Sequence, residues 1–246
     1  MMENPLTLEP LLSIGPVPIT APVAVTWAIM LALTLGSWLA TRRLSLQPGK
    51  LQTVLELFVT TVDGQIRDTM QTDPSPYRTL IGTIFLFVLI ANWSSLIPGI
   101  EPPTAHLETD AALALIVFAA TVWFGIATRG LKGYLATFAE PSWVMIPLNL
   151  VEQITRTFSL IVRLFGNVMS GVFVVGIVLS LAGLLVPIPL MALDLLTGTV
   201  QAYIFAILAT VFIGAAANGE APGDTSSKTP SQAPTQETSN QETETP

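Results

Sequence analysis

The chain has 246 residues, of which 51% are hydrophobic and only 11% are charged, and its mean hydropathy is +0.64. Soluble proteins carry about 25% charged residues, so this chain has too little charge to cover a water-facing surface. It contains no cysteine and one histidine, which excludes disulfide frameworks, thiol catalysis and histidine-rich metal sites. The net charge is −7, of which five acids and one lysine in residues 218–246 contribute −4, and the chain has no basic surface for nucleic acid. The composition predicts an integral membrane protein without a cofactor or metal.

Three stretches are long and apolar enough to cross a bilayer, which takes about 20 residues of helix. They are residues 22–40, 78–97 and 111–128. Residues 50–70 differ, because their apolar side chains recur every three or four positions between acidic and basic ones. That pattern is typical of an amphipathic helix that lies in the membrane interface.

The following segment predicts a long helical hairpin. Its first helix, within residues 143–186, has 39 residues without proline after Pro147. As one helix these would span about 58 Å, against a hydrocarbon core of about 30 Å, so we expect a steep tilt. A second helix is expected over 190–217. Residues 218–246 have no large apolar side chain and predict a disordered tail, which leaves 1–217 as the membrane domain. The fold class is therefore all-α, with about five membrane-embedded helices.

The ten basic residues set the expected orientation. None of them lies in residues 1–41 or 98–110, and most lie in 42–78 and 129–140. Cytoplasmic loops are enriched in Lys and Arg, so this distribution places the N-terminus and the 98–110 loop outside and the tail in the cytoplasm. His106, in the outer loop, is expected to be solvated.

Polar residues form a stripe along the first helix of the hairpin. They are spaced three or four apart, which favours one continuous helix over two short ones broken near Gly166. The stripe consists of Asn149, Glu152, Arg156, Ser159, Arg163, Asn167 and Ser170. The second helix has a stripe of its own, made of Asp194, Thr197, Gly198 and Gln201. Two facing stripes inside a bilayer predict an aqueous or proton-conducting seam.

Arg163 is the most informative single residue. An arginine at mid-bilayer costs about 2.5–3.5 kcal/mol on insertion scales, and no acidic residue lies within one turn of it. Its charge needs a carboxylate or water. Asp194 of this chain would make a structural pair that docks two helices; the alternative partner is a carboxylate of another subunit. The small residues Gly166, Ser170 and Gly171 fit close packing in either case.

Four further polar residues have two interpretations each. Glu152 and Arg156 are spaced i, i+4 and form either a helix ion pair near the cytoplasmic end or part of an ion exit path. Asn92 and Ser95 lie late in the 78–97 span and either satisfy backbone groups or line an ion path.

The sequence SLIVRLFGN at residues 159–167 resembles the corresponding segment of subunit a, the membrane stator of bacterial F-type rotary ATP synthases. The resemblance extends to NWSSLIP at 92–98, IPLN at 146–149 and QAYIF at 201–205, and covers about residues 50–216. It implies two offset half-channels that carry H⁺ or Na⁺ to and from the carboxylates of a rotating c-ring. It also implies the peripheral-stalk subunit b and, indirectly, the F1 head as partners, the bacterial plasma (inner) membrane as location, and no bond chemistry in this chain.

The resemblance assigns roles by position. Arg163 matches the family's essential arginine, Gln201 matches the glutamine of the last helix, and Ser159 and Asn167 match polar positions that flank the arginine. The half-channel lining that it implies consists of Asn92, Ser95, Asn149, Glu152, Ser159, Asn167 and Ser170.

The chain departs from the common pattern of the family at four positions, which is typical of a divergent branch. Val172 and Asn149 stand where many members have Glu, Asp194 where they have His, and Ser95 where they have Asp. We therefore expect that the inlet carboxylate has moved from one helix to its neighbour and is now Asp194.

Two other classes of function use the same polar residues differently. A secondary ion transporter or small ion channel would use Arg163 and Asp194 as an internal site and predicts an inverted repeat, which is not visible between the two halves. A structural scaffold would not need an arginine at mid-bilayer.

Overall fold

The computed structural model describes residues 10–14, 17–42, 49–97, 100–139, 145–182 and 186–218. Almost all of the predicted tail lies outside these ranges. In chain order the described elements are the strands β1 (Pro10–Ile14) and β2 (Val17–Thr20), the helices α1 (Ala21–Thr41), α2 (Lys50–Met70) and α3 (Ser75–Trp93), the 3₁₀ turns η1 (Ser94–Leu96) and η2 (Pro103–Ala105), and the helices α4 (Leu107–Ala139), α5 (Met145–Ala182) and α6 (Pro187–Asn218).

Among the described residues, five helices, α1 and α3 to α6, are long and apolar enough to cross a membrane. The predicted all-α membrane fold with about five membrane-embedded helices is therefore confirmed. One element was not expected: β1 and β2 form a short antiparallel hairpin before α1, in which Ile14 pairs with Val17.

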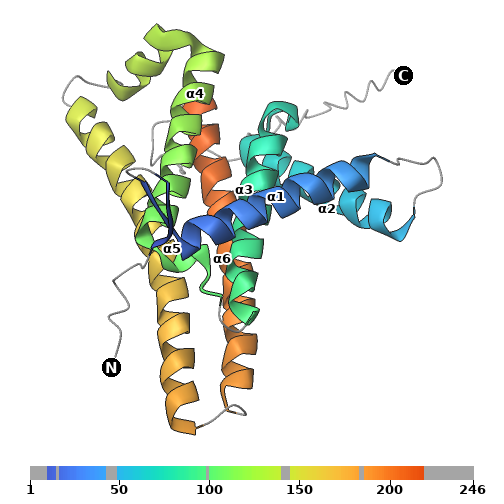
Figure 1. Cartoon of the computed structure of the whole chain (residues 1–246). Coiled ribbons are helices and arrows are strands. Elements are labelled where there is room, and N and C mark those ends of the chain that lie inside the picture. The colour runs from blue at the N-terminus through green and yellow to red at the C-terminus, as the bar shows by residue number, and fades with distance from the viewer. Residues whose placement is uncertain are drawn as a thin grey trace, which may run out of the picture.

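The helices α3 to α6 form a bundle (Figure 1), in which α5 packs against α6 and against α4, and α3 and α4 pack against α6. The core lies where these four helices meet and is made of apolar side chains that include Val88, Leu113, Val117, Leu164 and Phe205. In Figure 1, α1 crosses this bundle at a steep angle, and most of its surface is exposed.

α5 is one continuous helix of 38 residues, about 57 Å long, and it is not broken at Gly166. This confirms the prediction of a long helical hairpin. The sequence signal for it was the polar stripe, whose helical spacing continues through Gly166 without a change of phase.

α4 begins earlier than the sequence predicted. The sequence predicts an outer loop up to Asp110 and a third span at 111–128, but the helix starts at Leu107 and continues to Ala139. Glu108 and Asp110 lie in its first turn, where acidic side chains interact favourably with the helix N-terminus. Gly130 has a φ of +73°, which glycine adopts readily, and kinks the helix beyond the expected span.

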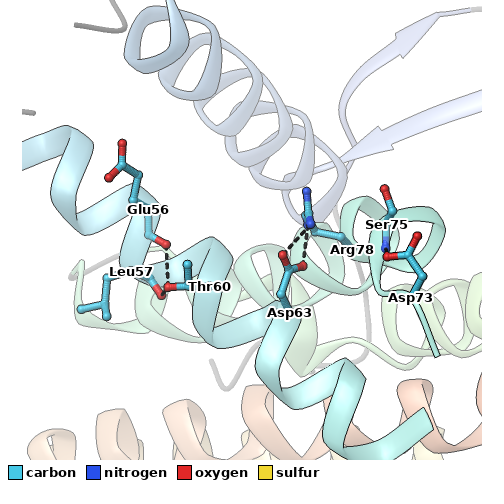
Figure 2. A network of polar contacts seen from close by, with 7 residues as sticks. All are labelled: Glu56, Leu57, Thr60, Asp63, Asp73, Ser75 and Arg78. Carbon is cyan, nitrogen blue, oxygen red and sulfur yellow. Dashed lines mark hydrogen bonds and ion pairs between the residues drawn. The ribbon is translucent and has the colours of Figure 1, made fainter. Parts of the chain in front are cut away.

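An ion pair ties α2 to α3 (Figure 2). Arg78 donates from Nε and Nη2 to the two carboxylate oxygens of Asp63. The side-chain amide of Asn218, at the end of α6, donates to the carbonyl oxygen of Met70 at the end of α2, at 3.1 Å. These contacts hold the amphipathic helix against the bundle.

Candidate functional site

The polar stripe of α5 follows the border between two different faces of the helix. On one side lies a buried face with Leu160, Leu164 and Val168, and on the other an exposed apolar face with Phe158 and Val162. Within the stripe the environment varies: Asn149 is buried, Glu152, Arg156 and Asn167 are half-buried, and Ser159, Arg163 and Ser170 are exposed. The stripe therefore follows one edge of the helix, and along it the side chains pass from the interior of the bundle at Asn149 to an uncovered surface at Arg163 and Ser170.

Arg163 is exposed on this edge, and no carboxylate among the described residues lies within 4.0 Å of it. The alternative of an Arg163–Asp194 pair is therefore wrong for this structure. Asp194 contacts Gly171, which lies eight residues beyond Arg163 on α5, or about 12 Å along the helix axis. This offset keeps the two charged groups apart.

Asp194 lines a cavity of about 170 Å³ between the α5–α6 hairpin and the residues that follow α3. Ser95, Glu101 and Val172 also contribute to its wall. The side chain of Glu101 is 71% exposed, so the cavity opens to the surface. A half-buried carboxylate thus lies in a small, mostly apolar cavity that can be reached from outside the bundle.

The carboxylate of Asp194 rests directly on the backbone of α5. A Cβ added at Gly171 would lie 2.1 Å from Asp194 Oδ1 and 2.8 Å from Asp194 Cγ, so a side chain at this position would collide with the carboxylate. Val172, the next residue of α5, lines the same cavity as Asp194, so the Asp194 carboxylate occupies the space beside residue 172. This geometry supports the hypothesis that a carboxylate on α6 substitutes for one on α5.

Asn92 joins three elements through its side chain. Its Nδ2 donates to the carbonyl oxygen of Gly198 in α6 at 3.0 Å, and its Oδ1 accepts from the hydroxyl of Thr104 in η2 at 2.7 Å. The Ser95 hydroxyl donates to the carbonyl oxygen of Asn92 at 2.9 Å. Asn92 therefore satisfies a backbone group, as one interpretation predicted, and Ser95 connects it to the cavity at Asp194.

Glu152 and Arg156 form the helix ion pair that their spacing predicted, with Arg156 Nη2 2.6 Å from Glu152 Oε1. The Arg156 guanidinium also lies over the ring of Phe212, 5.2 Å from its centroid. A further role of Glu152 in an exit path stays a prediction.

His106 is not solvated as expected. Its side chain is only 14% exposed, and its Nε2 lies 3.4 Å from a carboxylate oxygen of Glu101. The reason is that the segment before α4 folds back onto the bundle through η2 and does not extend away from it.

Asp110 is the candidate that sequence reasoning missed. The sequence predicts that it belongs to the outer 98–110 loop, yet it is 0% exposed and neither of its carboxylate oxygens has a hydrogen-bond partner within the described ranges. Asp110 precedes Ala114 and Val117, which are both buried, by four and seven residues. This helical spacing was the one sequence signal that placed Asp110 on the buried face of α4.

Gln201 is likewise buried, and its Nε2 has no hydrogen-bond partner in the described part of the chain. No group of three or more His, Asp or Glu side chains that could hold a metal ion occurs in that part either.

Residues 23–214 match the family described as ATP synthase A chain. The chain is 56% identical to ATP synthase subunit a 2 of Bradyrhizobium sp. over 223 residues, which is 91% of this chain and 100% of that protein. It is 48% identical to ATP synthase subunit a of Albidiferax ferrireducens, over 83% of this chain and 89% of that protein. It is 52% identical to ATP synthase subunit a 1 of Chlorobaculum parvum, over 79% and 87% respectively.

Proposed function

The chain belongs to the ATP synthase A chain family, and on this premise we propose that it forms both ion half-channels of the membrane stator in a bacterial rotary ATP synthase. It acts with a c-ring, a peripheral-stalk subunit b and, indirectly, the F1 head. It lies in the plasma membrane with its N-terminus outside, and it performs no bond chemistry of its own.

The exposed Arg163 is the observation that carries this proposal. A guanidinium on a membrane helix needs a counter-charge, and within the described ranges no carboxylate approaches it. Next to it, α5 leaves an apolar face uncovered, including Phe158 at 64% and Val162 at 49% exposure. A ring helix with a carboxylate would cover this face and pair with Arg163. The arginine then favours the charged form of that carboxylate and blocks a direct leak between the half-channels.

The cavity at Asp194 is the proposed inlet. An ion enters from the outside past Glu101, reaches Asp194 and neutralises a ring carboxylate. On this side Ser95 lines the cavity, and Asn92 lies beside it and accepts the hydrogen bond of Ser95. The exit to the cytoplasm follows the other end of the α5 stripe. The residues assigned to the exit and to the contact with the ring are Asn149, Glu152, Ser159, Asn167, Ser170 and Gln201. Each charge that crosses 100 mV releases about 2.3 kcal/mol, so several ions must pass for each ATP.

The test is substitution of Arg163 in the assembled complex. Arg163→Ala should leave the subunit inserted and assembled, as seen on a blot of the native complex, but abolish ATP-driven ion uptake into vesicles. Arg163→Lys should also fail, because an ammonium lacks the planar fork and can lose its proton when desolvated. Arg67→Ala, which removes an exposed guanidinium from α2, is the matched control and should pump normally.

Coupled pumping by Arg163→Ala would refute the stator role of this residue. Ion uptake by vesicles that contain this chain without a c-ring would instead favour an independent ion transporter.

A further inference from the structure

Asp110 lies on the face of α4 that packs into the core. Leu113, Ala114 and Val117, which follow it by three, four and seven residues, belong to the same core cluster as Leu164 of α5. Asp110 therefore begins a buried stripe that faces the core of the bundle and not the surface.

Its position relative to the cavity at Asp194 follows from the hydrogen bonds of Asn92. These bonds join Thr104 in η2 and Gly198 in α6 to one another through a single side chain. Asp110 lies six residues after Thr104, in the first turn of α4, and Gln201 lies three residues after Gly198. In Figure 1, α4 and α6 run in the same direction, and in sequence Gln201 lies further along α6 than Gly198, while Asp110 lies at the start of α4.

A carboxylate in this environment is costly as an anion. Asp110 is fully buried, and both of its oxygens lack a donor among the described residues. The N-terminus of α4 offsets only part of the cost of this buried charge. A carboxyl group without hydrogen-bond donors avoids the remaining penalty by holding a proton. A metal cation would need further ligands, and no cluster of three acidic or histidine side chains accompanies Asp110 in the described ranges. A proton is therefore the occupant that this chemistry favours.

We propose that Asp110 is a proton-binding carboxyl inside the bundle, a second acid in series with Asp194. Between the inlet cavity and the start of α4, Ser95 donates to the backbone carbonyl oxygen of Asn92 at 2.9 Å, and Thr104, six residues before Asp110, donates to Asn92 Oδ1 at 2.7 Å. In this arrangement the proton moves between the two carboxyl groups past these side chains. The transport role rests on the proposed function, whereas the protonation of Asp110 does not.

Protonation is tested first, by infrared spectroscopy of the full chain in lipid nanodiscs at neutral pH. Asp110→Asn should remove one carbonyl band of a protonated carboxyl. Glu108→Gln is the matched control, because Glu108 lies in the same first turn but is exposed, and it should remove none. If Asp110→Asn does not insert, Asp110→Glu should keep the band at a shifted position. An unchanged band in every Asp110 variant would overturn the proposal.

The transport role is tested in membranes that contain the assembled complex with its head removed. Asp110→Asn should slow passive proton flux about 100-fold, the size of effect typical for loss of a proton-transfer group, at unchanged subunit content. Glu108→Gln should leave the flux as in the wild type. Normal flux in Asp110→Asn, together with loss of pumping in Arg163→Ala, would refute the transport role of Asp110 and leave the proposed function intact. Pumping by Arg163→Ala would refute the proposed function, while the infrared result would still decide the protonation of Asp110.

Discussion

Replacing Gly171 by alanine tests the contact on which the proposed inlet depends. The added Cβ would lie 2.1 Å from Asp194 Oδ1, far inside van der Waals distance, so the carboxylate must move or α5 and α6 must separate. Gly176 lies on the same helix and lines the same cavity, but a Cβ there would meet nothing within 4 Å. Gly176→Ala is therefore the matched control.

The magnitude follows from the difference between these two variants. Both gain about 1 kcal/mol of helix propensity, because alanine replaces glycine in a helix. Only Gly171→Ala also suffers overpacking, which typically costs about 1–3 kcal/mol. We expect the free energy of unfolding of Gly171→Ala to lie below that of Gly176→Ala by about 1–3 kcal/mol. Ion flux through the assembled membrane sector should fall in Gly171→Ala only, because Asp194 is displaced from the cavity.

The assay is denaturant unfolding of the purified chain in nanodiscs, paired with flux measurements on the assembled complex. In an Asp194→Ala background the collision is removed, so Gly171→Ala should no longer destabilise the chain. A cost of Gly171→Ala that is the same with and without the Asp194 carboxylate would show that the contact is not its cause.

Three further outcomes are expected. Asp194→Asn should slow ion flux severely without loss of assembly, and adding Val172→Glu should restore part of the flux, since residue 172 lines the same cavity; wild-type flux in Asp194→Asn would contradict this. Asn92→Leu should lower the free energy of unfolding by about 1–3 kcal/mol in denaturant titration, because it leaves buried hydrogen-bonding groups at Gly198 and Thr104 without their partner. Truncation after Asn218 should preserve assembly and pumping, because residues 219–246 contain no large apolar side chain, and loss of the complex on a native gel would show otherwise.

Local sequence signals were sufficient for the helices. A helix such as α1 or α2 needs only its own hydropathy or amphipathic spacing, and the observed ranges of Ala21–Thr41 and Lys50–Met70 enclose or equal the expected ones. The unbroken α5 followed from the spacing of its polar stripe, which persists through Gly166. The start of α4 did not follow, because acidic residues and prolines before the span resemble a solvated loop until η2 folds that segment onto the bundle.

The sequence by itself determined that Arg163 has no acidic residue within one turn on its own helix and that Asp194 lies on the neighbouring one. Only the tertiary structure decided that these two do not pair, that Asp194 rests on Gly171, and that Asp110 is buried without a hydrogen-bond partner within the described ranges. The physical reason is that helical periodicity depends on neighbours a few residues apart. Axial offsets between helices and the burial of a side chain depend instead on packing between segments that are distant in the sequence.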